Sequence, residues 1–234
     1  MKTILFQGDS ITDCGRYRKE TDKKKSSIAF FRDGKLMKKI TALGDGYPAM
    51  VSAELENSNP GDYRFINRGV SGDRITDVYS RIVKDIIKLK PDYMSLLIGV
   101  NDVWRNYDSD GTGTGVARFE KIYDILLDEL KEEFPELKII IMGAFVIRGT
   151  ATDDRKDQPD RYSRFRSDVA EMADIAKKLA EKYGHSFIDL QAAFDEAVKT
   201  VPASELSGDG VHPTIKGHQL ITEKWLEAFK KAEA

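Results

Sequence analysis

The chain has 234 residues, a formal net charge of -2, 41% hydrophobic residues and 32% charged residues. This length suits one sizeable α/β domain and is short for two, and the balanced charge argues against the clustered basic face of a nucleic-acid-binding protein. A single cysteine, Cys14, rules out an internal disulfide, and no apolar run reaches membrane-spanning length. We therefore expect no membrane or nucleic-acid partner. We also expect a cytoplasmic location, because the short apolar start of MKTILFQGDS runs straight into Gly8 and Asp9.

Short apolar runs alternate with longer amphipathic segments along the chain. The short runs are typical of strands, and the longer segments have helical spacing. In chain order we expect a strand at Thr3–Gln7, a helix at Tyr47–Glu56, a strand at Arg64–Asn67, a helix at Ile75–Leu89, a strand at Tyr93–Ile98, a helix at Val116–Phe134, a strand at Lys138–Met142, a helix at Arg161–Tyr183, a strand at Ser186–Asp189, and helices at Gln191–Thr200 and Thr214–Lys231. Strict alternation predicts one α/β domain over residues 1–234, with five parallel strands and helices on both faces.

Two segments interrupt this alternation. We expect residues 16–45, which are rich in lysine, to form a long loop or flap, with KETDKKKSS as an exposed loop and FFRDGK as part of a small hairpin. Residues 106–115, NYDSDGTGTG, are expected as a mobile loop. Their glycines fit neither of the common phosphate-binding motifs, so nucleotide binding is not expected.

Polar motifs follow the carboxyl ends of the expected strands, which is where open parallel sheets bind ligands. Gly8-Asp9-Ser10-Ile11 follows the first strand and Asn67-Arg68-Gly69-Val70-Ser71-Gly72-Asp73 the second. Gly99-Val100-Asn101-Asp102 follows the third, and Asp209-Gly210-Val211-His212-Pro213 lies beyond the fifth strand and its helix. Their common location at one edge of the sheet predicts a single site.

Ser10 is the candidate nucleophile, and a serine hydroxyl needs an adjacent base at neutral pH. His212 is the candidate base, with Asp209 three residues earlier to hold its ring and stabilise the imidazolium. His185 lies at the amino end of the last strand, and His218, inside the last helix, is expected to cap or to face solvent. Taken singly, Ser10 also fits a helix cap, and the DGVH segment also fits a polar turn.

An acyl-transfer site also needs hydrogen-bond donors for the oxyanion. The backbone N–H groups of Ser10 and Gly72 and the side-chain amide of Asn101 are the candidates. Trp104 is a candidate to stack on a sugar ring or to wall an acyl pocket, although a core or interface tryptophan fits equally well. Asp13 is expected to position the loop after Ser10 by local hydrogen bonds.

The motifs GDSI, VSGD, GVND and DGVH resemble the four blocks of the SGNH (GDSL) hydrolases, which supply Ser10, Gly72, Asn101 and His212 in family order. The longer stretches GDSITDCGRYR, INRGVSGD, IGVNDVWRNYD, DLQAAFDE and DGVHPTIKGH resemble the intracellular acetylxylan esterases of that superfamily. The resemblance implies a three-layer α/β/α sandwich of flavodoxin-like type. It also implies a serine esterase that removes acetyl groups from small carbohydrates such as acetylated xylo-oligosaccharides, through an acetyl-serine intermediate and with no metal or organic cofactor. Association into a homo-oligomer is compatible with it.

The chain departs from the family pattern in two places. Residue 73 is aspartate, where many relatives have asparagine after the glycine, and residues 16–45 look longer than in close relatives. Alternative functions use the same residues differently. A GDSL lipase or thioesterase would keep the machinery, although the chain lacks a long apolar lid. A metal-dependent phosphoesterase would use Asp9, Asp209 and His212, with His218 as a further candidate ligand, and a sugar-binding scaffold would use no catalytic residue at all.

Overall fold

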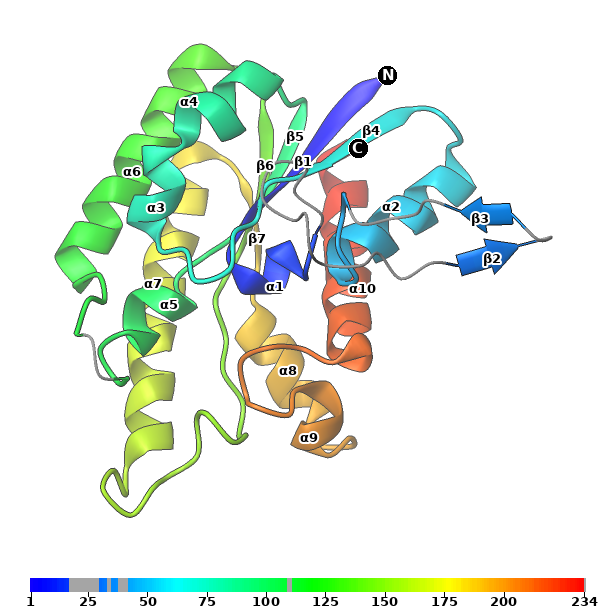
Figure 1. Ribbon diagram of the computed structural model, residues 1–234. Coiled ribbons are helices and arrows are strands. Elements are labelled where there is room, and N and C mark those ends of the chain that lie inside the picture. The colour runs from blue at the N-terminus through cyan, green and yellow to red at the C-terminus, as the bar shows by residue number, and fades with distance from the viewer. Residues whose placement is uncertain (17–29, 33–34, 38–41, 109–110, 234) are drawn as a thin grey trace.

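A five-stranded parallel sheet in the order β4-β1-β5-β6-β7 lies at the centre of the protein (Figure 1). The computed structural model describes residues 1–16, 30–32, 35–37, 42–108 and 111–233. The strands are β1 (Lys2–Gly8), β4 (Tyr63–Asn67), β5 (Tyr93–Leu97), β6 (Lys138–Met142) and β7 (Ser186–Ile188). Each end lies within one residue of the expected bound, so the predicted five-stranded parallel α/β fold is confirmed.

Helices cover both faces of the sheet (Figure 1). One layer contains α2 (Tyr47–Ser58), α8 (Leu190–Ala197) and α10 (Ile215–Glu233), and the other contains α3 (Ile75–Ser80), α4 (Ile82–Asp85), α6 (Val116–Glu133) and α7 (Arg161–Tyr183). Because side chains alternate along a strand, β1 serves both layers. Leu5 belongs to the core under α3, α4, α6 and α7, whereas Ile4 and Phe6 belong to the core under the other helices. This is the expected three-layer sandwich.

The prediction of one continuous helix at Ile75–Leu89 is wrong. The structure instead has α3, α4 and a short 3-10 helix, η1 (Ile87–Leu89). The backbone leaves helical geometry at Arg81 (φ −111°, ψ 10°), whose side chain forms ion pairs with Asp73 and Asp85. Apolar residues on either side of the interruption are still buried at helical spacing, so the hydrophobic pattern alone continues through it.

Three one-turn helices were not expected from the sequence: α1 (Ser10–Asp13), α5 (Val100–Trp104) and α9 (Ala203–Leu206). They are too short to show a hydrophobic period. α1 follows β1 and α5 follows β5, and these two strands flank the point where the strand order reverses. Ligands of open α/β sheets bind at such a point, so Ser10 and Asn101 occupy the expected edge.

The two segments that interrupt the alternation are described in part. β2 (Phe30–Arg32) and β3 (Lys35–Met37) pair antiparallel as a separate two-stranded sheet, which is the hairpin expected around FFRDGK. The exposed loop expected at KETDKKKSS lies outside the described residues. In the second segment, residues 111–115 form no helix or strand, but Thr114 N donates to Asp102 O at 2.8 Å and so joins this stretch to α5. Its mobility stays a prediction.

Candidate active site

Ser10 occupies the first position of α1, two residues after the end of β1. Gly8 has a φ of +155°, and a Cβ there would lie 2.3 Å from the Leu97 carbonyl oxygen, so only glycine permits this tight exit from the sheet. Asp9 Oδ1 then accepts a hydrogen bond from Ile11 N at 3.0 Å and caps α1. The turn holds the Ser10 Oγ 2.8 Å from His212 Nε2.

His212 and Asp209 lie in the loop that precedes α10. Asp209 Oδ2 is 2.6 Å from His212 Nδ1, and its Oδ1 accepts the backbone amides of Val211 at 2.9 Å and His212 at 2.7 Å. With the carboxylate facing Nδ1, that nitrogen carries the proton and Nε2 is left to accept from the Ser10 hydroxyl. The structure therefore joins the three predicted residues in one chain of hydrogen bonds.

The protonation of this trio follows from its contacts. Burial raises the pKa of Asp209, but the hydrogen bonds from the His212 ring and from two backbone amides outweigh it and hold that pKa well below its usual range. The hydrogen bond to Asp209 in turn raises the pKa of His212. At neutral pH the carboxylate is ionised, and it will stabilise an imidazolium when His212 takes up a proton.

Beyond Ser10, the candidate oxyanion donors lie on the loop after β4, which contains Gly72, and on α5, which contains Asn101; hydrogen bonds join the two segments. Gly72 has a φ of +83°, a conformation that favours glycine. Its carbonyl oxygen accepts from the Arg105 guanidinium at 2.8 Å, and the Asn101 amide donates to the Asp73 carbonyl oxygen at 3.1 Å. Asp13 was expected to act locally, but its carboxylate reaches across to accept from Ser71 N at 3.0 Å. It thereby ties α1 to the Gly72 loop.

Trp104 lies beside the trio. Its ring centroid is 5.8 Å from that of His212 and 6.1 Å from that of Phe165. The indole N–H donates to the Asp108 carboxylate, which is also paired with Arg161 at 3.0 Å. The ring therefore lies next to the candidate base, His212.

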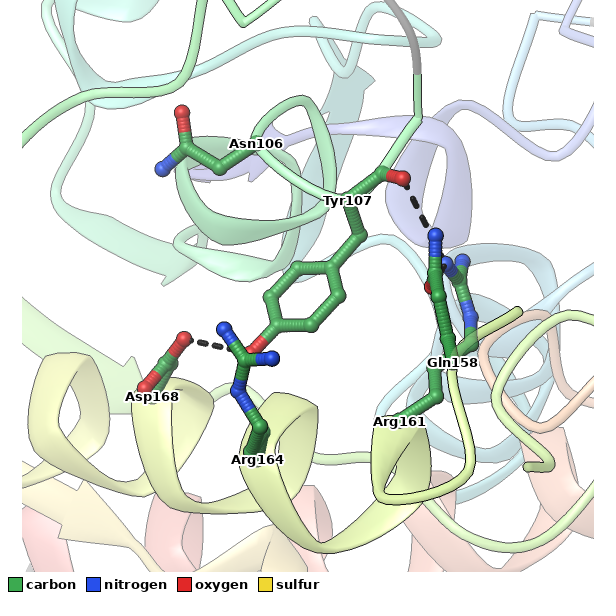
Figure 2. Close-up of a pocket in the computed structure, with 6 residues that line it drawn as sticks. All are labelled: Asn106, Tyr107, Gln158, Arg161, Arg164 and Asp168. Carbon is green, nitrogen blue, oxygen red and sulfur yellow. Dashed lines mark hydrogen bonds between the residues drawn. The ribbon is translucent and has the colours of Figure 1, made fainter. Parts of the chain in front are cut away.

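A polar cavity of about 230 Å³ adjoins the segment after Trp104 (Figure 2). Figure 2 shows Tyr107, whose hydroxyl donates to Asp168 at 2.6 Å, between Arg161 and Arg164. The remaining lining residues are Asn106 and Gln158. Asn106 and Tyr107 belong to the stretch IGVNDVWRNYD, but no role was predicted for any of these residues. The others come from α7 and its preceding loop, and no motif joins them to that stretch.

The other two histidines lie apart from this chemistry. His185 precedes β7 at its amino end, as expected, and burial lowers its pKa to about 4. His218 is buried, so the expectation of a surface role is wrong, but its Nδ1 accepts from Tyr47 N at 3.3 Å and so caps α2. Its Nε2 lies 3.2 Å from the Cys14 Sγ. Among the residues that the structure describes, no group of three His, Cys, Asp or Glu side chains is arranged to hold a metal ion.

Comparison with known proteins identifies a family and similar structures for this chain. The profile of the GDSL-like Lipase/Acylhydrolase family matches residues 6–220. An acetylxylan esterase from Geobacillus stearothermophilus is 35% identical over 233 residues, which cover 95% of this chain and 91% of that protein. A solved acetylxylan esterase from the same organism has a TM-score of 0.76 and 33% identity, covering 97% of this chain and 93% of that one. A solved alpha/beta hydrolase from the metagenome of Lake Arreo, Spain, has a TM-score of 0.79 and 28% identity, and the match covers 98% of this chain and 95% of that one.

Proposed function

The chain belongs to the GDSL-like lipase and acylhydrolase family, and we propose that it is a serine esterase that removes acetyl groups from small carbohydrates. The hydrogen-bonded chain from Ser10 through His212 to Asp209 is the observation that carries this proposal. A hydroxyl, an imidazole and an ionised carboxylate in that order are the parts needed for nucleophilic acyl transfer. None of the helices in the described part of the chain is long and apolar enough to cross a membrane.

In the proposed mechanism, Ser10 Oγ attacks the carbonyl carbon of the acetyl ester while His212 Nε2 removes the hydroxyl proton. The resulting tetrahedral intermediate collapses, and His212 returns the proton to the departing sugar oxygen. Water then attacks the acetyl-serine and gives a proton to His212, and acetate leaves as Ser10 regains that proton. Asp209 holds the ring in the required tautomer and stabilises the imidazolium in both halves of the reaction.

The negative oxygen of each tetrahedral intermediate needs fixed donors. We assign the Ser10 and Gly72 N–H groups and the Asn101 amide to this role. The Asn101 amide has two N–H bonds, and within the described part of the chain one of them donates to Asp73 O, which leaves the other for the oxyanion. Hydrogen bonds from Arg105 to Gly72 O and from Ser71 N to Asp13 fix the Gly72 loop. Donors that are already fixed before the reaction are what make an oxyanion hole effective.

The proposed substrate is a small acetylated carbohydrate, with acetylated xylo-oligosaccharides as the leading candidates. The sequence match and the solved structure that are acetylxylan esterases from Geobacillus stearothermophilus support this choice. Trp104 beside His212 supports a short acyl group, because a rigid aromatic wall excludes longer chains by overlap. The polar cavity lined by Tyr107 and Arg164 offers hydroxyl-binding groups near that wall. Action in the cytoplasm is part of the proposal, in keeping with a chain whose single cysteine forms no internal disulfide.

The test compares wild-type protein with Ser10→Ala on acetyl, butyryl and octanoyl esters of one leaving group, and then on acetylated xylo-oligosaccharides. We expect the highest kcat/KM for acetyl, no activity in Ser10→Ala, and no effect of a chelator. A fluorophosphonate should label wild-type protein at Ser10, as read by peptide mass spectrometry. Rates that rise from acetyl to octanoyl would favour a lipase or thioesterase, and loss of activity on chelation would favour a metal-dependent esterase.

A further inference from the structure

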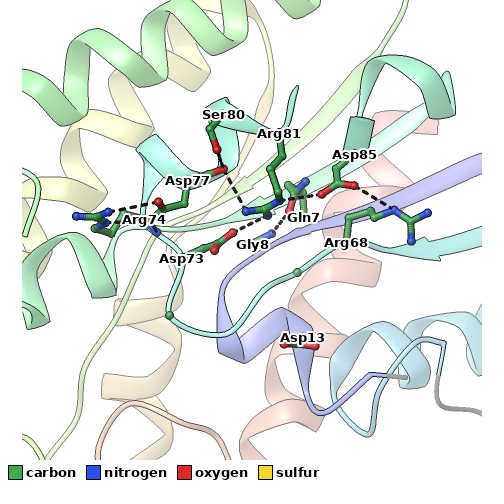
Figure 3. A network of polar contacts seen from close by, with 12 residues as sticks. Gln7, Gly8, Asp13, Arg68, Asp73, Arg74, Asp77, Ser80, Arg81 and Asp85 are labelled. Atoms are coloured by element: carbon green, nitrogen blue, oxygen red, sulfur yellow. Dashed lines mark hydrogen bonds and ion pairs between the residues drawn. The ribbon is translucent and has the colours of Figure 1, made fainter. Parts of the chain in front are cut away.

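Asp73 follows Gly72 directly on the loop after β4. Its side chain is only 8% exposed, and Oδ2 lies 2.5 Å from Arg81 Nη2 (Figure 3). The aspartate is therefore one half of a nearly buried ion pair. A lone carboxylate at this point would oppose the negative charge that develops on a nearby oxyanion.

Arg81 is held in place from its other side. Its Nε donates to Asp85 Oδ2 at 2.8 Å, and its Nη1 donates to the Asp77 carbonyl oxygen at 3.1 Å. Asp85 also pairs with Arg68 at 3.6 Å, so charges alternate along the row that Figure 3 shows. Arg81 lies at the interruption between α3 and α4. Its hydrogen bonds to Asp77 and Asp85 fix its side chain to these two helices.

The backbone of Asp73 is connected to two candidate oxyanion donors, Gly72 by the peptide bond and Asn101 by a hydrogen bond. Its carbonyl oxygen accepts from the Asn101 amide at 3.1 Å, and its N–H closes the turn by donating to the Val70 carbonyl oxygen at 3.1 Å. Arg105 holds the carbonyl of Gly72, which belongs to the peptide bond that joins Gly72 to Asp73. A displacement of Asp73 would therefore move the Gly72 loop and the Asn101 side chain together.

We infer that Arg81 is a positioning residue for the oxyanion hole, acting through its ion pair with Asp73. The pair anchors the loop to the α3–α4 interruption and neutralises the aspartate charge beside the developing oxyanion. This inference rests on the proposed function, because it assigns a role within the same site. Asp73 and Arg81 then act together, because the positive charge of Arg81 neutralises the negative charge of Asp73.

The test uses Arg81→Gln, Asp73→Asn and the double variant, with kcat and KM measured on an acetyl ester. Rates are expressed per Ser10 labelled by a fluorophosphonate, so that misfolded protein is not counted. Arg81→Gln leaves the Asp73 carboxylate unpaired, and we expect kcat to fall about 10- to 100-fold with KM within about twofold. The Asp73→Asn change should cost less, and the double variant should recover to the Asp73→Asn level. Arg81→Lys, which keeps the charge, should lie between wild type and Arg81→Gln.

The matched control is Arg166→Gln, which breaks a similar ion pair with Asp195 (Nη2 to Oδ2, 2.5 Å) between α7 and α8. Its kcat should stay within about twofold of wild type. A normal kcat in Arg81→Gln would overturn the inference. So would losses that multiply in the double variant, or a double variant as slow as Arg81→Gln, because each would mean that Arg81 does not act through Asp73.

A second measurement separates this inference from the proposed function. Methylboronic acid forms a tetrahedral adduct with an active serine, and its Kd should rise in Arg81→Gln about as much as kcat falls. If wild-type protein cleaves no acetyl ester, the proposed function fails. The Kd of methylboronic acid for Arg81→Gln, compared with that for wild type, still decides whether Arg81 positions the donors. Equal Kd values for the two proteins would overturn that role.

Discussion

Asp9 is a buried carboxyl group beside the nucleophile, and from the sequence it was considered only as a candidate metal ligand. It caps α1 through Oδ1, but Oδ2 is buried and has no hydrogen-bond partner among the residues that the structure describes. Burial raises the pKa of Asp9 from 3.8 to about 7. The group is therefore largely neutral in the folded protein at mildly acidic pH, while in the unfolded chain it is ionised.

Asp9→Asn should stabilise the protein more at pH 8 than at pH 5. Between pH 3.8 and about 7 the folded wild-type protein holds a proton that the unfolded chain has lost, so its free energy of unfolding falls as pH rises. Asparagine caps a helix as well as aspartate does, and it does not titrate, so it contributes no pH dependence to the free energy of unfolding. The advantage of the variant should grow by roughly 2–3 kcal/mol between the two pH values. Urea unfolding at each pH measures it, and a pH-independent difference would mean that the buried group is ionised throughout.

The acidic limb of the pH–rate profile should belong to His212, which must be neutral to act as the base. The Asp209 hydrogen bond raises the pKa of His212, so kcat/KM should increase with pH and reach half its maximum above pH 6.5. Asp209→Asn removes that carboxylate, which should move the midpoint to lower pH and reduce kcat by about 10⁴, the loss seen for this change in another serine hydrolase. A midpoint that stays in place in Asp209→Asn would assign the limb to a different group.

At the scale of the element, the sequence was most informative where a hydrophobic period ran for several turns. The bounds of α7, Arg161–Tyr183, match the expected range at both ends. The interruption at Arg81 was missed because it depends on partners from other segments, above all Asp73, and leaves the burial pattern unchanged. The role of His218 was half predicted. Its capping partner, Tyr47, is 171 residues away in sequence, which no local pattern can reveal.

His218→Ala should lower stability by about 1 kcal/mol, the usual value of a helix cap, with little change in kcat. The first residue of α2 donates its N–H to His218, and the preceding Gly46 has no side chain with which to cap. Burial lowers the pKa of His218 to about 4, so wild-type protein loses stability as pH falls below 6.5, where the unfolded histidine takes up a proton. Protonation of the unfolded histidine removes roughly 2 kcal/mol of wild-type stability between pH 8 and pH 5, so the advantage of wild type over the variant should shrink from about 1 kcal/mol at pH 8 and reverse by pH 5. Urea titrations at both pH values check this, and a wild-type advantage that grows toward pH 5 would contradict it.

For the whole molecule, the motifs at the strand ends predicted which residues meet, but not what supports them. Ser10, His212 and Asp209 are linked as expected, and Gly72 and Asn101 are joined through Asp73. The cavity lined by Tyr107 and Arg164 was missed, because its walls meet only after α7 packs beside α5. Local chemistry could be read from short motifs, whereas supporting contacts between distant segments required the tertiary structure.

The two apolar cores lie on opposite faces of one sheet, and the central strands contribute to both. In β5, Leu96 packs in one core and Leu97 in the other, and β6 divides in the same way between Ile141 and Met142. Neither core can be lost without exposing strands that the other needs, so we expect the chain to unfold as one cooperative unit. A Trp104→Phe variant leaves Trp225, a fully buried residue of α10, as the single tryptophan. Its fluorescence and the far-ultraviolet circular dichroism should give the same urea midpoint. A fluorescence midpoint at clearly lower urea would show that the layer containing α2, α8 and α10 unfolds separately.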